Sequence, residues 1–591
     1  MDLRWDLNQL YPSFESAKFK EDLTRVENKI TEINEWVEDN LNSEKDEVRQ
    51  IEEFLELLRE FRRKYSLLAK FAQLKLSVNA NNTEAASYAE ELEKKESDLT
   101  KAQVAFQRWL GEIDNLAAVI AQSELLGEHE FYLKELAQQS QYLLSNEEEV
   151  TISKLQTTGS SAWYKLKQKL VSNLMVEITL EGEEQELPLS KVRNMAYDSD
   201  GEKRKKAYEA ELDSYTKIED AVASCLNSIK GESLTLSQRR GYESPLEKSL
   251  ISSRLEQDVL DAMIEAMKDS LPDFQRYYST KGELLGHEEG LPFYDLFAPV
   301  GTEEMEFNYD EAQNFIINNF RTFSDSLADY AERAFQDDWI DAKPRAGKNG
   351  GAFCMNIHPL GQSRILANFA GSFSNVSTLA HELGHGFHGE CLKEESIFNT
   401  DYPMPLAETA SIFCETIIQK AALEEADEEE RLGILENSLM GAGQIIVDIY
   451  SRYLFEKEVF AERKNSALAI DKLKELMIDS QKRAYGDSLD SDYLHPYMWI
   501  NKIHYYIPGF DFYNYPYAFG LLFGKGLYAQ YQEQGSDFVQ GYQDLLAATG
   551  KKNAVEVASM MGIDITDVGF WQQSLEIIKE DIEEFIRLTQ T

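Results

Sequence analysis

The residues best suited to chemistry lie in the segment STLAHELGHGFHGEC, residues 377–391. His381 and His385 are four residues apart, so a helix would place both imidazoles on one face, with Glu382 beside them. This pattern is typical of a site that holds one divalent metal ion and uses the glutamate as a base. Incidental histidines on a surface helix are the alternative, but His381, His385 and His388 are three of only 8 histidines in the chain. We expect His388 to have a packing or supporting role.

A catalytic zinc held by two histidines needs a third protein ligand and an open position for water. The extended HExxHxxGxxH arrangement is excluded, because positions 388 and 391 are His and Cys. We therefore expect the third ligand to be Glu408, which lies in the helical segment PLAETASIFCETIIQKAAL, residues 405–423. Glu415 follows seven residues later on the same stripe and is expected to support a ligand histidine. A helix cap or a solvent-exposed position is the alternative for either acid.

Two histidines and a glutamate around zinc, with Glu382 adjacent, indicate metal-assisted hydrolysis of an amide bond. Zinc lowers the pKa of a bound water from about 15.7 to about 7, and Glu382 could carry the proton to the leaving amine. The segment at residues 499–520 could donate hydrogen bonds to the developing oxyanion. A tyrosine-rich core strip is the alternative. The candidate donors are His504, Tyr505, Tyr506, Tyr513, Tyr515 and Tyr517.

The elements that must position these residues are mainly helical. Apolar residues recur at steps of three and four between Ile51 and Leu68, which predicts an amphipathic helix, and similar patterns fill most of the first 170 residues. Two hairpins interrupt the helices, one near residues 174–190 and one formed by 351–358 and 363–371. The second leads directly into the metal-binding helix, for which Ser374, Asn375 or Ser377 could provide the N-cap.

Composition excludes several classes of partner. The 60 basic and 105 acidic residues give a net charge of −45, which disfavours nucleic acid and anionic membrane surfaces. The N-terminal segment has no apolar core of an export signal, and no stretch of 18 uncharged apolar residues follows. The 4 cysteines form no CxxC pair, which fits a reducing compartment. We therefore expect a cytoplasmic protein without nucleic-acid or membrane partners.

The sequence also resembles a known family. The segments LANFAGSFSNVSTLAHELGHGFH, LAETASIFCE and HYYIPGFDFYNYPYAFG look like the oligoendopeptidase F branch of the thimet oligopeptidase family, as do WDLNQLYP and LPFYDLFAP. The resemblance spans essentially the whole chain. It implies a mainly α-helical, two-lobed ellipsoid with a deep central channel and a small β-sheet beside the HExxH helix. We expect a helical N-terminal lobe at residues 1–195 and a catalytic metallopeptidase domain at 196–591.

The resemblance implies a role for individual positions. His381, His385 and Glu408 match the zinc ligands, Glu382 the base and Glu415 the acid behind a ligand. The strand from Ile365 to Gly371 resembles an edge that pairs with the substrate backbone. The loop after His504 is longer than in oligoendopeptidase F itself, and Phe510 occupies a place where the mammalian relatives carry a tyrosine, so the oxyanion-stabilising tyrosine stays open among 513, 515 and 517. The resemblance thus implies catalytic His504 and Tyr517, and substrate contacts by Phe369, Ala370, Gly371, Tyr513 and Tyr515.

These observations predict a zinc endopeptidase, with one Zn²⁺ ion, that hydrolyses internal bonds of short unstructured peptides. A zinc exopeptidase of the carboxypeptidase type is the first alternative, and would need a clamp for a peptide terminus, for which Arg345, Lys348 and Arg364 are candidates. A catalytically silent helical peptide-binding scaffold is the second, although such a module has no use for a general base. A monomer and a homodimer are both compatible with the sequence.

Overall fold

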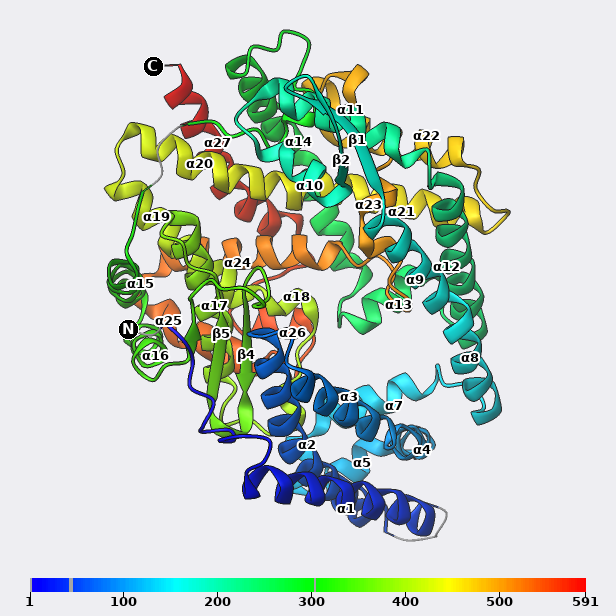
Figure 1. Cartoon of the computed structure of the whole chain (residues 1–591). Helices are drawn as coiled ribbons and strands as arrows, with labels where there is room; N and C mark the ends of the chain where they lie inside the picture. The colour runs from blue at the N-terminus through cyan, green and yellow to red at the C-terminus, as the bar shows by residue number, and fades with distance from the viewer. Residues whose placement is uncertain (1–2, 42–45, 302–304, 591) are drawn as a thin grey trace. The chain divides into compact units, whose positions relative to one another are not determined.

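The computed structural model describes residues 3–41, 46–301 and 305–590 of the 591-residue chain. The described chain is mainly α-helical, as the sequence predicts, with two small sheets (Figure 1). Contacts divide it into two compact units. The first unit contains Met1–Leu143, Glu306–Ala421 and Tyr531–Gly562, and the second contains Leu144–Met305, Ala422–Gln530 and Ile563–Thr591. A division of the chain into domains at residue 195 stays a prediction.

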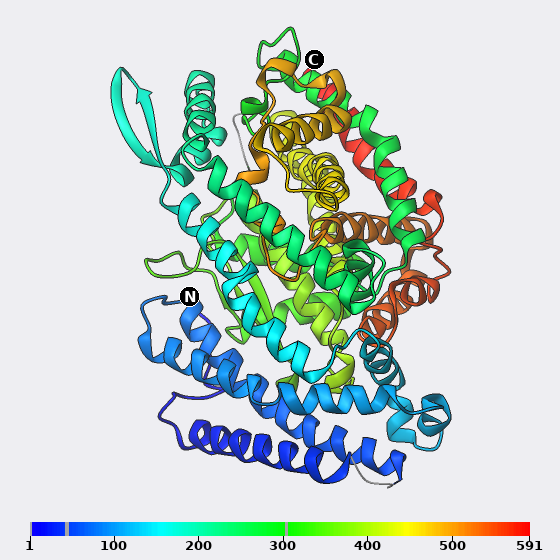
Figure 2. The ribbon, with the colours of Figure 1, turned by 90° about the vertical axis from the view of Figure 1, so that its right-hand side faces the viewer.

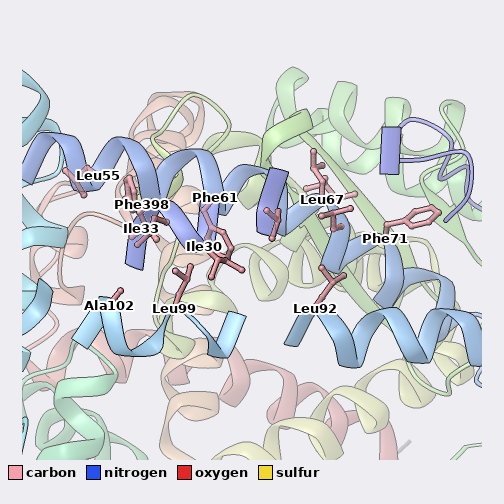
Figure 3. Close-up of a cluster of buried hydrophobic side chains, with 14 of the residues drawn as sticks. Ile30, Ile33, Leu55, Phe61, Leu67, Phe71, Leu92, Leu99, Ala102 and Phe398 are labelled. Carbon is pink, nitrogen blue, oxygen red and sulfur yellow. The ribbon is translucent and has the colours of Figure 1, made fainter. Parts of the chain in front are cut away.

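The first unit begins with a layer of helices. The helix expected between Ile51 and Leu68 is confirmed as part of α2, and α1 lies alongside it (Figure 2). Both present apolar residues every three or four positions to a common core, together with residues of α3 and α4 (Figure 3). The helices of this layer are α1 (Ala17–Asn40), α2 (Glu47–Ser77), α3 (Thr83–Ser97), α4 (Thr100–Gly111), α5 (Leu116–Ile120), α6 (Glu124–Glu128) and α7 (Glu130–Ser140).

A three-stranded sheet in the same unit supports the candidate metal helix. The strands β3 (Ile340–Asp341), β4 (Phe353–Ile357) and β5 (Gln362–Leu366) are ordered β3-β5-β4, with β4 and β5 antiparallel. This confirms the second predicted hairpin. Ile357, Leu366 and Phe398 belong to the same core as α1 and α2, so the helical layer holds the sheet in place.

The sheet and the remaining helices of the first unit surround α17, which carries the candidate site. α17 contacts both β4 and β5, and it also contacts α16 and α25 (Figure 1). Helix α19 begins in the first unit and continues into the second. The bounds of these helices are α15 (Tyr309–Phe323), α16 (Asp325–Gln336), α17 (Phe373–Cys391), α18 (Met404–Ala407), α19 (Thr409–Glu425), α25 (Phe538–Ala548) and α26 (Ala554–Ser559).

The second unit is a helical assembly in which α14 and α27 pack along one another. The buried Lys281 of α14 donates to a carboxylate oxygen of Glu436 in α20, and Tyr277 donates to its other oxygen. The helices are α8 (Asn146–Thr158), α9 (Ser160–Ser172), α10 (Leu189–Asn194), α11 (Gly201–Tyr215), α12 (Glu219–Arg240), α13 (Pro245–Ser252), α14 (Gln257–Leu284), α20 (Glu428–Gly443), α21 (Ile449–Arg463), α22 (Ile470–Tyr485), α23 (Met498–Asn501), α24 (Tyr515–Gln534), which runs on into the first unit, and α27 (Val568–Thr589).

The hairpin predicted near residues 174–190 is also confirmed. β1 (Met175–Leu180) and β2 (Glu183–Pro188) pair in antiparallel register, and the hairpin lies beside α11 (Figure 2). The turn uses Glu181 and Gly182, both at positive φ, as a two-residue hairpin turn requires. Among the helices of the described residues, none combines the length and the apolar character needed to cross a membrane.

Candidate metal and catalytic site

The HELGH segment forms the middle of α17. Ser372 caps this helix, its side chain accepting a hydrogen bond from the backbone N–H of Asn375. The cap therefore precedes the three positions that the sequence suggested, because the helix already begins at Phe373. The Asn375 side chain instead accepts from the N–H groups of Ala370 and Gly371 and fixes the turn before the helix.

Three side chains converge on one point of the first unit. His381 Nε2 lies 3.3 Å from Glu408 Oε2, and His385 Nε2 lies 3.5 Å from the same oxygen. The planes of the two imidazole rings lie at 83° to each other, and the ring centroids are 4.9 Å apart. Within the described ranges, this is the group of His, Cys, Asp and Glu side chains whose ligand atoms, all within 4.8 Å of one another, could hold a metal ion. The predicted proximity of Glu408 to the two histidines is confirmed.

Glu408 owes its position to a break in the helix that the sequence predicted as continuous over 405–423. α18 ends at Ala407, Glu408 is its C-cap, and α19 begins at Thr409. Ser411, one turn into α19, donates a hydrogen bond of 2.9 Å to Glu408 Oε2. This support was missed in the sequence, although its spacing of three residues from Glu408 is a recognisable signal.

A second acid lies behind His381. Glu415 Oε2 is 3.1 Å from His381 Nδ1, and Ser377 donates to the other oxygen of Glu415 at 3.4 Å. An imidazole whose Nδ1–H is donated to a carboxylate presents an unprotonated Nε2 to a metal. The expected contact between Glu415 and a candidate ligand is therefore confirmed.

Gly384 allows α17 and α19 to approach closely. A Cβ atom at this position would lie 2.5 Å from the carbonyl oxygen of Ala410 and 2.6 Å from Cα of Ser411. Both are backbone atoms, so a side chain larger than hydrogen would push the two segments apart. Asn356 of β4 adds a second constraint, because its side-chain amide donates to the carbonyl oxygen of His385 at 3.0 Å. Neither residue stood out in the sequence.

The charges of this site favour a cation. Burial alone would lower the pKa of His381, but its hydrogen bonds to Glu408 and Glu415 outweigh burial and raise the pKa to about 10. Burial alone would raise the pKa of Glu408, but His381 and His385 outweigh it and lower the pKa to about 2. Burial lowers the pKa of His385 to about 4. The two carboxylates thus create a field that attracts positive charge next to two imidazole nitrogens.

This donor set fits zinc. Two imidazoles and one carboxylate are a known ligand combination for catalytic zinc, and the acid behind His381 would orient the ring. A divalent ion would take the place of the proton that Glu408 and Glu415 stabilise on His381. The set is too poor in oxygen ligands for calcium or magnesium, which prefer six or more oxygens.

Glu382 is adjacent to this group but is not engaged by it. The residue is 6% exposed, and its Oε2 atom is buried with no hydrogen-bond partner in the described part of the chain. Burial raises the pKa of this carboxyl to about 7, while His381 opposes the increase. A buried oxygen without a partner is costly in a purely structural residue.

His388 has the packing role expected for it. Its ring stacks on Tyr402 with centroids 4.1 Å apart, and its Nε2 lies 2.8 Å from the hydroxyl of Thr549. Burial lowers the pKa of His388 to about 3, so the ring is neutral.

The predicted donors of residues 499–520 lie in the second unit. His504, in a 3₁₀ turn at Ile503–Tyr505, stacks on Tyr513 with ring centroids 5.2 Å apart. Tyr517 meets both rings edge-on, at 6.1 Å from His504 and 6.0 Å from Tyr513. We call these three residues the aromatic trio. Burial and the cations Arg452, Lys502 and Lys167 lower the pKa of His504 to about 4.

Tyr515 is separate from the aromatic trio. Its ring is 1% exposed, and its hydroxyl donates to Ser253 and accepts from Ser249, both at or near the end of α13. Tyr505 and Tyr506 are also fully buried. These contacts favour packing roles for the three tyrosines, whereas we expected a substrate contact for Tyr515.

A buried charge cluster holds the loop that carries the trio. Asp511 lies 3.2 Å from the Lys230 ammonium, which also pairs with Glu456 at 2.6 Å. Glu456 in turn accepts from the backbone N–H of Phe512, a residue whose φ of 53° is unusual for a bulky side chain. The cluster therefore fixes a strained turn immediately before Tyr513. No local sequence pattern indicates this cluster, because α12 and α21 supply its other members.

One expectation for the first unit is wrong. The strand from Ile365 to Gly371 is not a sheet edge, because β5 ends at Leu366 and lies between β3 and β4. The backbone N–H of Phe369 donates to Ala342, and those of Ala370 and Gly371 donate to Asn375. The short strand β3, distant in sequence, makes β5 central. Among the described strands of this sheet, β4 pairs with β5 alone.

The three cations that could have clamped a peptide terminus near this sheet are occupied. Arg345 binds both oxygens of Asp341, and Lys348 lies 2.8 Å from the same carboxylate. Arg364 is fully buried and donates to the carbonyl oxygens of Asp6 and Ser363. These contacts do not favour the predicted clamp.

Comparison with known proteins assigns this arrangement to a family. The model of peptidase family M3 matches residues 194–577, and that of oligopeptidase F matches residues 112–175. An oligoendopeptidase F homologue of Lactococcus lactis is 23% identical over 100% of this chain and 97% of its own length. The group B oligopeptidase PepB of Streptococcus agalactiae is 24% identical over 81% of this chain and 80% of its own.

Solved structures share the fold. The crystal structure of oligoendopeptidase F from Enterococcus faecium has a TM-score of 0.70 at 19% identity and covers 96% of this chain and 99% of its own. A structure from Chlamydophila abortus has a TM-score of 0.83 at 21% identity, covering 99% and 98%. The chain belongs to peptidase family M3, whose members are zinc metalloendopeptidases. It is a metallo-oligopeptidase related to oligoendopeptidase F.

Proposed function

We propose that this protein is a zinc-dependent endopeptidase that hydrolyses internal bonds of short, unstructured peptides. The observation that carries the proposal is the convergence of His381, His385 and Glu408 beside a buried carboxylate oxygen of Glu382 that has no partner within the described residues. The names of the relatives support an oligopeptide substrate. Selection of short peptides by an enclosed channel remains part of the proposal.

His381, His385 and Glu408 would hold the zinc ion. When bound there, zinc would polarise the peptide carbonyl and acidify a water molecule. Glu415 accepts the Nδ1–H of His381 and so keeps its Nε2 directed at the ion. Ser411 holds the carboxylate of Glu408 in the same way.

Glu382 would move the proton. Its Oε2 would accept a proton from the attacking water and deliver it to the nitrogen of the leaving amine, so that the carboxylate is regenerated in each turnover. Burial of Glu382 lowers the cost of holding the proton between the two steps.

The aromatic trio would bind the substrate and stabilise charge on its carbonyl oxygen. His504 is neutral and can donate one N–H, while the hydroxyls of Tyr513 and Tyr517 can donate in addition. We propose Tyr517 as the principal donor and Tyr513 as a substrate contact. The substrate contacts of Phe369 and Ala370 would be made through side chains and carbonyl groups, because the backbone N–H groups of residues 369–371 are occupied. Gly371 would contact the substrate through its Cα only, because its carbonyl oxygen accepts from the N–H of Phe307.

An internally quenched peptide with both ends blocked tests the endopeptidase proposal. We expect the wild-type protein to cleave it and Glu382→Gln to lower kcat by about 10²–10⁴-fold. The zinc content of the variant should stay near one per chain. Failure to cleave the blocked peptide while a free peptide is trimmed from one end would establish the exopeptidase alternative. Unchanged turnover in the zinc-loaded variant would exclude Glu382 as the base.

We also propose a cytoplasmic location. All four cysteines, Cys225, Cys354, Cys391 and Cys414, are free thiols, which is compatible with a reducing compartment. The strongly acidic composition continues to disfavour nucleic-acid and membrane partners. Monomer and homodimer both remain compatible with the proposal.

A further inference from the structure

The second unit contains a cavity of about 270 Å³ that no step of the proposed reaction uses. Its wall includes Arg193 of α10 and Lys502, which follows α23 and precedes His504 by two residues. Arg193 is 40% exposed in its side chain, and Lys502 is 18% exposed. The volume is sufficient for one or two amino-acid residues but is small for a ligand pocket. Such a space suits the end of a chain better than its middle.

The cations around this cavity outnumber the anions. Arg452 and Lys167 do not line the cavity, but together with Lys502 their charges lower the pKa of the nearby His504. The charge of Arg193 lowers the pKa of both Lys167 and Lys502. The carboxylates paired with this group are Glu211, 3.3 Å from Arg193 Nε, and Asp448, which binds Arg452 and lies 3.5 Å from Lys502. Four cations thus share two carboxylates in a chain of net charge −45.

Two of these cations show the surplus directly. Lys167 is 1% exposed, and within the described ranges its ammonium has no carboxylate partner and instead lies 4.9 Å from the ring centre of Tyr506. Burial and Arg193 lower the pKa of Lys167 to about 8. Burial lowers the pKa of Lys502 to about 8 as well, against Asp448, with Arg452 and Arg193 adding to the decrease. An uncompensated buried charge is costly unless an anion joins it.

In the described part of the chain, the cavity wall also contains hydrogen-bond donors that are not used by protein acceptors. Arg193 uses Nε toward Glu211, and within the described ranges its two terminal nitrogens have no protein acceptor. A guanidinium with two free N–H₂ groups matches the two oxygens of a carboxylate. Arg204, which also lines the cavity, is not available in this way, because its Nε pairs with Asp295 and its Nη1 donates to the carbonyl oxygens of Asp198 and Ser199.

We propose that this cavity binds the free C-terminal carboxylate of the peptide substrate through Arg193 and Lys502. The proposal rests on the proposed peptidase function, because it takes the ligand to be a peptide. Binding the terminus would place the preceding residues of the substrate next to His504, which follows Lys502 by two residues. The cavity would therefore contribute to the choice of short peptides with an unblocked C-terminus.

Three versions of one internally quenched peptide test the proposal. The first has a free C-terminal carboxylate, the second a C-terminal amide, and the third an amide after a final glutamate. We expect amidation to raise KM about tenfold with kcat changed less than twofold, as for loss of one charge-assisted contact. Equal KM values for acid and amide would overturn the proposal. Recovery of the low KM by the glutamate peptide would show a site for any carboxylate and would overturn the assignment to the terminus.

Variants assign the effect to the cavity. We expect Arg193→Ala to raise KM for the free acid to the value of the amide, and Arg193→Lys to keep part of the difference. Arg239→Ala is the matched control, since Arg239 is 63% exposed and pairs with Glu148 outside the cavity. It should retain the full acid–amide difference. Retention of that difference in Arg193→Ala would exclude this cavity.

The wild-type comparison needs no variant, so the proposal remains testable if Arg193→Ala fails to fold. The two proposals also fail differently. If the peptidase proposal is wrong, none of the three peptides is cleaved, or cleavage survives removal of zinc. If only the carboxylate proposal is wrong, all three are cleaved with similar KM.

Discussion

The closest backbone approach in the candidate site allows a quantitative prediction for Gly384→Ala. The new Cβ would lie 2.5 Å from the carbonyl oxygen of Ala410 and 2.6 Å from Cα of Ser411, whereas ordinary contacts are 3.4–4 Å. Relief of this overlap requires α17 and α19 to separate by about 1 Å. Glu408 lies two residues before Ala410, so its carboxylate would move away from His381 and His385.

A shift of this size is large for a metal site. Ligand distances to zinc are normally held within about 0.2 Å, and loss of support for one ligand costs about 10–100-fold in affinity. We therefore expect Gly384→Ala to weaken zinc binding by at least tenfold and to lower the free energy of unfolding by about 1–3 kcal/mol. Zinc affinity is measured by competition with a chelator of known strength, and stability by thermal unfolding of the zinc-free protein.

The matched control is Gly441→Ala in α20. A Cβ at this helical position meets nothing within 4 Å, so the change should leave zinc binding unaltered and stabilise the helix by about 0.5–1 kcal/mol. Wild-type zinc affinity and activity in Gly384→Ala would refute the argument that the close approach of the two helices sets the geometry of the three ligands.

Three further predictions concern the remaining parts of the proposed machinery. Glu415→Gln should weaken zinc binding by about 10–100-fold, because His381 loses its charged acceptor, and an unchanged zinc affinity would contradict the role of Glu415. Asp511→Asn should lower the free energy of unfolding by about 2–3 kcal/mol, below the usual 3–5 kcal/mol for a broken buried pair because Lys230 keeps Glu456; a loss of stability without any rise in KM would separate this cluster from the aromatic trio. His504, whose pKa is lowered to about 4, should be neutral above pH 5 and gain its proton only as pH falls through 4, so its ring signals in ¹⁵N-histidine NMR should titrate far below 6.5, and a midpoint near 6.5 would contradict the proposed neutral donor.

Much of the fold followed from local patterns. The period of apolar residues in α2 predicted the helix, and the alternating runs predicted both hairpins, because these signals depend on neighbours within a few residues. The pairing of His381 and His385 likewise follows from the geometry of a single helix. The predicted N-cap of α17 and the predicted continuous helix over 405–423 were wrong in detail, because Ser372 is the cap and the helix breaks at Glu408. Several nearby serines and small residues could have served on local grounds.

The relations between distant segments were decided by the tertiary structure. β3 makes β5 central, although nothing in residues 363–371 indicates a partner on that side. Gly384 matters only because α19 crosses it, and Asp511 is buried only because Lys230 of a distant helix neutralises it. The surplus of cations around Lys502 arises in the same way, from four different elements. Periodicity reports which face of an element is buried, but it does not contain the identity of the groups on the other side.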